Sequence, residues 1–144
     1  MANPKKQLNG SPDDIEQAYY EALAQGDIDA LMALWADDEE ILCIHPGGAR
    51  LLGHAAIRAS FAAMFERGRI AIRASQLHAT QNMLTAVHNL IEEVPLVDDG
   101  MPDIHILATN VYIKTPRGWR LSIHHASVAS GKAPGVASHT GVLH

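Results

Sequence analysis

One short apolar segment that stops at a histidine constrains the fold more than any other part of this sequence. Residues 41–45, Ile-Leu-Cys-Ile-His, alternate between two faces as a buried strand does, and Pro46-Gly47-Gly48 turns the chain directly afterwards. Helical patterns flank the segment on both sides. A strand that ends at His45 places a titratable ring where the backbone leaves the sheet, and the flanking helices can then wall a cavity around it.

Three helices are predicted in the N-terminal half. The first starts at Ser11-Pro12-Asp13-Asp14, which supplies a cap, a first-turn proline and first-turn acids, and it ends at Gly26. A second helix is expected over 28–35, and a third runs from Gly53 to a stop at Gly68. Side chains at helical spacing form their inner stripes: Ile15, Ala18, Tyr19, Ala22 and Leu23 (with Tyr20 off the stripe); Ile28, Leu31, Met32 and Trp35; Ile57, Ser60, Phe61, Met64 and Phe65.

The remainder of the sequence is predicted to form strands. After 41–45 we expect a short return strand over 50–52, then strands over 70–78, 83–94, 104–115 and 119–128, with turns at Asp98-Asp99-Gly100 and Pro116-Arg117. Helices followed by strands indicate an α+β protein, a curved antiparallel sheet wrapped as a cone around the helices. We expect one domain over 12–128, a frayed N-terminus over 1–11 and a mobile tail over 129–144.

The last hairpin predicts which residues share a face of the sheet. If Thr115 pairs with Gly118, Asn110 lies opposite Ile123, and Ala108 lies opposite His125. Asn110, Ile123 and His125 are then expected on one face. His124 is expected on the other face, while the side taken by His88 stays open.

Both predicted faces of the last two strands are largely apolar. Helices can cover one face, so the other needs a different cover, and a second copy of the chain supplies one most simply. We therefore expect a homodimer that packs sheet against sheet through the outer face, with His124 near the interface.

Composition excludes several classes of function. The chain of 144 residues has a formal charge of −5 and no basic cluster, which argues against nucleic acid as a partner. No apolar run approaches the roughly 20 residues of a membrane span, and no signal peptide is recognised. The single cysteine, Cys43, suits a reducing compartment, so we expect a soluble cytoplasmic protein. The nine histidines show no metal-ligand spacing, and no glycine-rich phosphate loop is present, so neither a metal nor a cofactor is predicted.

Several motifs together resemble a known superfamily. Within residues 19–65 these motifs are Gly26-Asp27-Ile28-Asp29-Ala30-Leu31, Trp35-Ala36-Asp37-Asp38 and Gly53. This stretch resembles the SnoaL-like and ketosteroid-isomerase-like proteins of the nuclear transport factor 2-like superfamily. Gly118-Trp119-Arg120-Leu121-Ser122-Ile123-His124-His125-Ala126-Ser127 resembles the last strand of the calcium/calmodulin-dependent kinase II association domain of the same superfamily. The resemblance extends over 12–128 and implies a cystatin-like α+β roll.

The isomerase pattern implies a role for three residues. It places a phenol seven residues before the Gly-Asp pair, where Tyr19 stands, and a carboxylate base just before a proline, where this chain has His45. It places a protonated acid in the strand before the final hairpin, where this chain has Asn110. The resemblance thus implies a phenol, an imidazole base and an amide. This chain departs from the steroid isomerase pattern at two positions, because the carboxylate base and the acid are both replaced.

A candidate site follows from these residues. Imidazole can abstract a proton at neutral pH, and a phenol and an amide N–H can stabilise an enolate oxygen. We expect Tyr19, His45 and Asn110 to be catalytic, and the expected ligand-binding residues are His125, Trp35, Ile57, Phe61 and Ile123. Each of the three has a purely structural alternative. His45 can be a turn residue hydrogen-bonded to the backbone, Tyr19 can be a core aromatic, and Asn110 can be a buried amide that only forms hydrogen bonds with its neighbours.

The sequence is compatible with three functions. The first is an enzyme that carries out isomerase, cyclase or dehydratase chemistry on a small apolar carbonyl-type ligand in the cone cavity. The second is a pocket that binds such a ligand without turnover. The third is an oligomerisation module like the kinase association domain.

Overall fold

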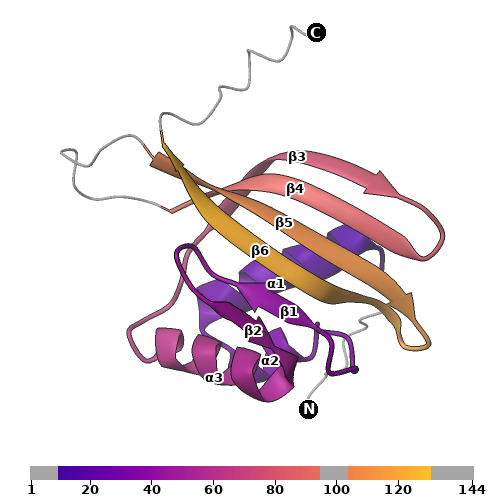
Figure 1. The fold of residues 1–144 in the computed structure, drawn as a ribbon, viewed down its shortest axis with the longest axis horizontal. Helices are drawn as coiled ribbons and strands as arrows, with labels where there is room; N and C mark the ends of the chain where they lie inside the picture. The colour runs from indigo at the N-terminus through magenta and orange to yellow at the C-terminus, as the bar shows by residue number, and fades with distance from the viewer. Residues whose placement is uncertain (1–9, 95–103, 131–144) are drawn as a thin grey trace, which may run out of the picture.

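The computed structural model describes residues 10–94 and 104–130, and within them a curved sheet is covered by helices on one face (Figure 1). The strands lie in the order β2-β1-β6-β5-β4-β3. The elements are α1 (Pro12–Gln25), α2 (Ile28–Met32), β1 (Leu42–Ile44), β2 (Arg50–Leu52), α3 (Gly53–Phe65), β3 (Arg73–Gln81), β4 (Thr85–Glu93), β5 (Ile104–Thr115) and β6 (Gly118–Ser130). The predicted α+β class, with its helices in the N-terminal half, is confirmed.

The sheet has one parallel contact. Strands β3 to β6 form an antiparallel meander, and β1, which pairs with β2 in antiparallel fashion, runs parallel to β6. In Figure 1, α1 crosses behind the long strands, and α2 and α3 lie beside β1 and β2. Since α1 covers the long strands, their inner face and this helix enclose the core.

Helix α1 starts and ends where its sequence predicts. The Ser11 hydroxyl accepts from the Asp14 amide at 3.2 Å, while the Asp14 carboxylate accepts from the Ser11 amide at 2.9 Å, which makes a reciprocal capping box. Gly26 follows the helix with φ of 65°, a left-handed conformation that glycine adopts without a Cβ clash. Both ends of the helix that carries Tyr19 are therefore fixed by local sequence.

Some predicted boundaries differ from the structure. Helix α2 ends at Met32 instead of 35, because the chain leaves the helix to pair with β6: Trp35 bridges Leu121, and the Ala36 amide donates to the Leu121 carbonyl at 2.8 Å. Helix α3 ends at Phe65, before Gly68. The predicted strand over 70–78 begins at Arg73 and extends to Gln81.

A β-bulge in β6 overturns the predicted faces of that strand. Tyr112 pairs with Leu121 as expected, but Val111 pairs with Ile123, so Ser122 is an extra residue in β6. Beyond the bulge Asn110 lies opposite His124, not Ile123, and Ala108 lies opposite Ala126, not His125. The inner position therefore belongs to His124.

Burial agrees with the corrected register. His124 is 4% exposed and packs in the interior, so the expectation that it faces a dimer interface was wrong. His125 is exposed and Ile123 is half-buried, both on the outer face of the sheet. His88, whose side was left open, is buried on the inner face opposite Asn110.

Parts of the sequence prediction lie outside the described residues. They are most of the expected N-terminal segment 1–11, the turn at Asp98-Asp99-Gly100 and most of the expected tail 129–144. None of the helices within 10–94 and 104–130 combines the length and apolar character that crossing a bilayer requires.

Candidate functional site

Polar side chains gather in the interior between α1 and the inner face of the sheet. All of them are buried, and they come from α1, β4, β5 and β6: Glu16, Tyr20, His88, Glu92, Asn110, Tyr112 and His124. Buried polar groups destabilise a fold unless they are hydrogen-bonded. We call these seven side chains the polar network, and its connections determine what the interior can do.

Glu16 joins α1 to two strands of the sheet. Its carboxylate accepts from the Tyr112 hydroxyl at 2.8 Å, from the Asn110 amide at 3.1 Å and from His88 Nδ1 at 3.0 Å. His88 Nε2 also lies 3.7 Å from an oxygen of Asp13 at the start of α1. Three donors around one carboxylate hold the helix in register over β4 and β5.

Asn110 uses its whole amide group within the polar network. Its Nδ2 donates to Glu16 Oε2 at 3.1 Å and to the Tyr20 hydroxyl oxygen at 3.2 Å. Its Oδ1 accepts from His124 Nδ1 at 2.6 Å. No amide hydrogen is left to donate to an oxyanion, so in this arrangement Asn110 orients its neighbours, unlike the role implied by the resemblance.

Tyr20 and His124 meet at Glu92. The Tyr20 hydroxyl donates to Glu92 Oε2 at 2.7 Å, and the same oxygen lies 3.9 Å from His124 Nε2. Burial raises the pKa of the Glu92 carboxyl, and nearby Glu16 raises it further. Burial lowers the pKa of His124 to about 3, reinforced by His45 and His125, so this imidazole is neutral at pH 7.

A run of aromatic contacts connects the polar network to His45. The Tyr19 ring lies 5.3 Å from the His124 ring and 6.3 Å from the Phe61 ring, centre to centre. The Phe61 ring in turn lies 4.9 Å from His45, edge to face. The structure thus brings Tyr19, His45 and Asn110 to one interior region, where Phe61 and His124 link them.

Tyr19 and His45 keep their polar atoms largely unengaged. Among residues 10–94 and 104–130 the Tyr19 hydroxyl has no hydrogen-bond partner, although the side chain is 1% exposed. The His45 ring contacts the sulfur of Cys43 at 3.9 Å through Nε2, and the ring makes no stronger polar contact within the described residues. A hydroxyl group without a protein partner can donate a hydrogen bond to a ligand or to water, so Tyr19 is a candidate donor in this region.

The local environment sets the ionisation of these groups. Burial raises the pKa of Tyr19, with Cys43 adding to the effect, so the phenol stays protonated. Burial lowers the pKa of His45, so its ring is neutral at pH 7. Burial also raises the pKa of Cys43 to about 12, which leaves it a thiol rather than a nucleophilic thiolate.

The other predicted site residues separate into two groups. Trp35, Ile57 and Phe61 belong to the buried core, and the indole Nε1 of Trp35 has no hydrogen-bond partner within the described part of the chain. Ile123 and His125 lie on the outer face because of the bulge, away from Tyr19. Their expected contact with the interior ligand does not fit this placement.

Sequence reasoning missed most of the polar network, although two signals were present. Glu16 and Tyr20 are four apart on α1, hence on one helix face, and His88 and Glu92 are four apart on β4, hence on one strand face. Tyr20 therefore lies on the inward side of α1, although the sequence pattern predicted that it lies off the inner stripe of this helix. His124 could not be found in this way, because nothing in the sequence marks the bulge.

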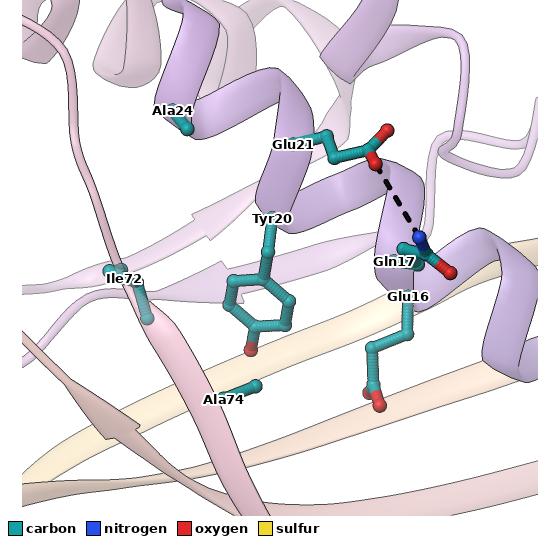
Figure 2. Close-up of a pocket in the computed structure, with 7 residues that line it drawn as sticks. All are labelled: Glu16, Gln17, Tyr20, Glu21, Ala24, Ile72 and Ala74. Atoms are coloured by element: carbon teal, nitrogen blue, oxygen red, sulfur yellow. Dashed lines mark hydrogen bonds between the residues drawn. The ribbon is translucent and has the colours of Figure 1, made fainter.

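A groove beside α1 leads to the edge of the polar network. Its volume is about 430 Å³, and its lining residues are Glu16, Gln17, Tyr20, Glu21, Ala24, Ile72 and Ala74. Figure 2 shows Tyr20 extending from α1 between Ile72 and Ala74, with Glu16 further along the same helix. A groove of this size can hold a small molecule. For metal ions, no set of three His, Cys, Asp or Glu side chains suits one within 10–94 and 104–130.

Comparison with known proteins agrees with the fold and the family. The model of the SnoaL-like domain family matches residues 13–131. Among curated proteins, none matches this sequence. A structure from Thiobacillus denitrificans, a candidate calcium/calmodulin-dependent protein kinase type II association domain, is 34% identical, with a TM-score of 0.78 over 87% of this chain and 100% of that one.

Two further structures extend the comparison. A candidate dehydratase of the NTF2-like family from Streptomyces avermitilis is 29% identical, with a TM-score of 0.71 over 84% of this chain and 100% of that one. An NTF2-like protein with a cystatin-like fold from Novosphingobium aromaticivorans is 23% identical, with a TM-score of 0.65 over 83% and 80% of the two chains, and shows the fold alone. The family match covers most of the sequence and agrees with the observed architecture, so the chain belongs to the SnoaL-like family.

Proposed function

We propose that this protein binds a small, largely apolar ligand with a carbonyl-type oxygen in the interior beside Tyr19 and His45, and acts on it by acid–base chemistry. The observation that carries the proposal is the contrast in hydrogen bonding. Each of the seven members of the polar network has a partner, whereas the Tyr19 hydroxyl has none within the described residues and the His45 ring has only the sulfur of Cys43 there as a polar contact. Both unengaged groups pack on Phe61.

The chemistry divides between the two side chains. Neutral His45 takes a proton from the carbon next to the carbonyl group, so that a C–H bond breaks and an N–H bond forms. The electrons of the C–H bond move to the carbonyl oxygen, and the Tyr19 hydroxyl donates a hydrogen bond to the enolate. In an isomerase His45 returns the proton to another carbon, and in a dehydratase it gives the proton to the departing hydroxyl group, which leaves as water. In a cyclase the enolate carbon forms a bond to a second carbonyl carbon of the ligand, and His45 gives the proton to the oxygen of that carbonyl group. The Streptomyces avermitilis relative, itself a candidate dehydratase, supports this class.

A thermal-shift screen of small carbonyl compounds tests the proposal. A compound that binds only the folded protein raises its Tm, and the rise reports affinity. We expect at least one compound to stabilise the parent protein and the control His78→Gln, whose histidine is exposed on β3, and to stabilise Tyr19→Phe and His45→Gln less. If a compound stabilises all four proteins equally, the roles given to Tyr19 and His45 are wrong.

A second candidate function is an assembly module without turnover. The 34% identity to a candidate kinase association domain, over that protein's whole length, favours it. We propose that copies of this chain associate through the outer face of the sheet, where Val111 and Ile123 lie opposite each other and half-exposed. Light scattering separates the possibilities: a dimer agrees with either function, whereas a larger ring that binds no compound in the screen favours assembly alone.

A further inference from the structure

The proposed chemistry makes no use of Glu92 and His124, two titratable side chains that are each 4% exposed and face each other. We propose that they share a single proton and form a second acid–base centre inside the protein, in which Asn110 determines which nitrogen of His124 is the base. This inference holds independently of whether Tyr19 and His45 bind a ligand.

The first step is the orientation of the Asn110 amide. One end of the amide lies 3.1 Å from Glu16 Oε2 and 3.2 Å from the Tyr20 hydroxyl oxygen. A carboxylate only accepts hydrogen bonds, so the end facing Glu16 must be the NH₂ group. The amide oxygen is therefore directed at His124.

The second step is the tautomer of His124. Its Nδ1 lies 2.6 Å from Asn110 Oδ1, and an amide oxygen only accepts, so the hydrogen must be on Nδ1. A neutral imidazole has one N–H, and Nε2 is then an unprotonated lone pair. Glu16, acting through Asn110, thus fixes Nε2 as the basic nitrogen.

The third step concerns the two facing acceptors. His124 Nε2 lies 3.9 Å from Glu92 Oε2, which already accepts from the Tyr20 hydroxyl. With no hydrogen between them, the Nε2 lone pair would face a carboxylate that has the Tyr20 hydroxyl as its donor, and two facing acceptors in a low-dielectric interior are unfavourable. One proton between them removes this penalty. The distance suits a bridging water, since two hydrogen bonds of roughly 2.8 Å that meet at one oxygen can span it.

The proton transfer balances within the pair. At rest the proton is on the Glu92 carboxyl group, which donates through the bridging water towards Nε2. In the transfer the carboxyl O–H bond breaks, the water passes on one of its own protons, and an N–H bond forms at Nε2, which leaves a carboxylate and an imidazolium. The Tyr20 hydroxyl continues to donate to the carboxylate and stabilises it.

Surrounding charges decide where the proton rests. The titratable groups near the pair on its own side of the sheet are Glu16, Tyr19, Tyr20, Cys43 and His45, and His125 acts from the outer face of β6. Glu16 disfavours a second carboxylate at Glu92, and protonated His45 or His125 disfavours an imidazolium at His124. The raised pKa of Glu92 and the lowered pKa of His124 agree with a neutral carboxyl beside a neutral ring.

Nuclear magnetic resonance of ¹⁵N-histidine in the full chain tests the tautomer without any ligand. With His124 assigned through its own backbone amide, we expect a neutral ring protonated on Nδ1 from pH 5 to pH 8. We expect Asn110→Ala, if it folds, to lose this preference for Nδ1. A parent ring protonated on Nε2 alone would overturn the proposal, and so would a folded Asn110→Ala that keeps the Nδ1–H form.

Infrared spectroscopy tests the carboxyl group. We expect a protonated-carboxyl band at pH 6 that disappears in Glu92→Gln and remains in Glu93→Gln, whose parent carboxylate is paired with Arg73. If Glu92→Gln does not fold, Tyr20→Phe replaces it, because loss of one donor to Glu92 must shift the band. If the band is absent while His124 is neutral, or if neither variant alters the band, Glu92 and His124 do not share a proton. Neither measurement involves a ligand, so their failure is separate from failure of the proposed function.

Discussion

At the scale of single residues, the interior is organised by one glutamate. Glu16 accepts from Tyr112, Asn110 and His88, and Asn110 then orients His124. Three strands of the sheet therefore depend on a single side chain of α1. Such a network is stable only while every member stays partnered, because an unpaired polar group in a low-dielectric interior is destabilising.

Replacement of Glu16 tests this organisation. Glu16→Gln turns one acceptor oxygen into an NH₂ group, which then faces a donor, so we expect a loss of about 1–3 kcal/mol in the free energy of unfolding. The control Glu21→Gln, on the exposed side of the same helix, should change it by less than about 0.5 kcal/mol. Urea denaturation measures both. Equal values for the two variants would show that the network contributes little to stability.

The pH dependence of stability reports His124. Its pKa is about 3 in the folded protein and roughly 6.5 when unfolded, so the unfolded chain binds more protons between these pH values. The free energy of unfolding therefore falls as pH decreases below about 6.5, by at most about 1.4 kcal/mol per unit from this group. We expect His124→Gln to show a shallower fall between pH 6.5 and 5, measured by urea denaturation.

Glu92 should act in the opposite direction. Its pKa is raised on folding, so its contribution to stability is present at low pH and is lost as pH rises through the folded value. Glu92→Gln should consequently steepen the fall towards acid. The exposed His78→Gln variant serves as the control. If both interior variants follow the parent curve, the two groups do not titrate as described.

At the scale of elements, α1 is the platform of the site, because it supplies Glu16, Tyr19 and Tyr20. Its capping box is local, so its loss can be measured separately from the interior. We expect Ser11→Ala to lower the free energy of unfolding by about 1 kcal/mol, since the Asp14 amide loses its acceptor. The exposed strand residue Ser127 offers the matched control Ser127→Ala, and an equal effect of both would rule out the cap as the cause.

Elements with local signals could be predicted from the sequence. The start of α1 at Pro12, its stop before Gly26 and the hairpin that joins Thr115 to Gly118 all follow from caps and turn residues. The bulge at Ser122 could not be predicted, because it depends on how β6 meets β5, β1 and the Trp35 bridge together. For the same reason the sequence could predict that Tyr19 lies on α1 and that His45 follows β1, whereas it could not predict the face on which His124 lies.

At the scale of the whole molecule, the proposed association through the outer face of the sheet predicts the oligomeric state of a variant. If copies associate there, a lysine at the Val111–Ile123 pair buries an unpaired charge. We expect Val111→Lys to produce monomers in light scattering. Ala63→Lys, exposed on α3, should behave as the parent protein does. A Val111→Lys protein with the parent's mass would place the interface elsewhere.

The dissociation constant of a screened carbonyl compound tests the interior site most directly. In calorimetry the Tyr19→Phe variant should bind it about tenfold more weakly than the parent protein, which corresponds to loss of one hydrogen bond of ~1.4 kcal/mol. Because the Tyr19 hydroxyl has no partner to lose within the described residues, the variant's stability should remain close to the parent's. An unchanged Kd in Tyr19→Phe would show that the ligand does not contact this hydroxyl and would contradict the proposed site.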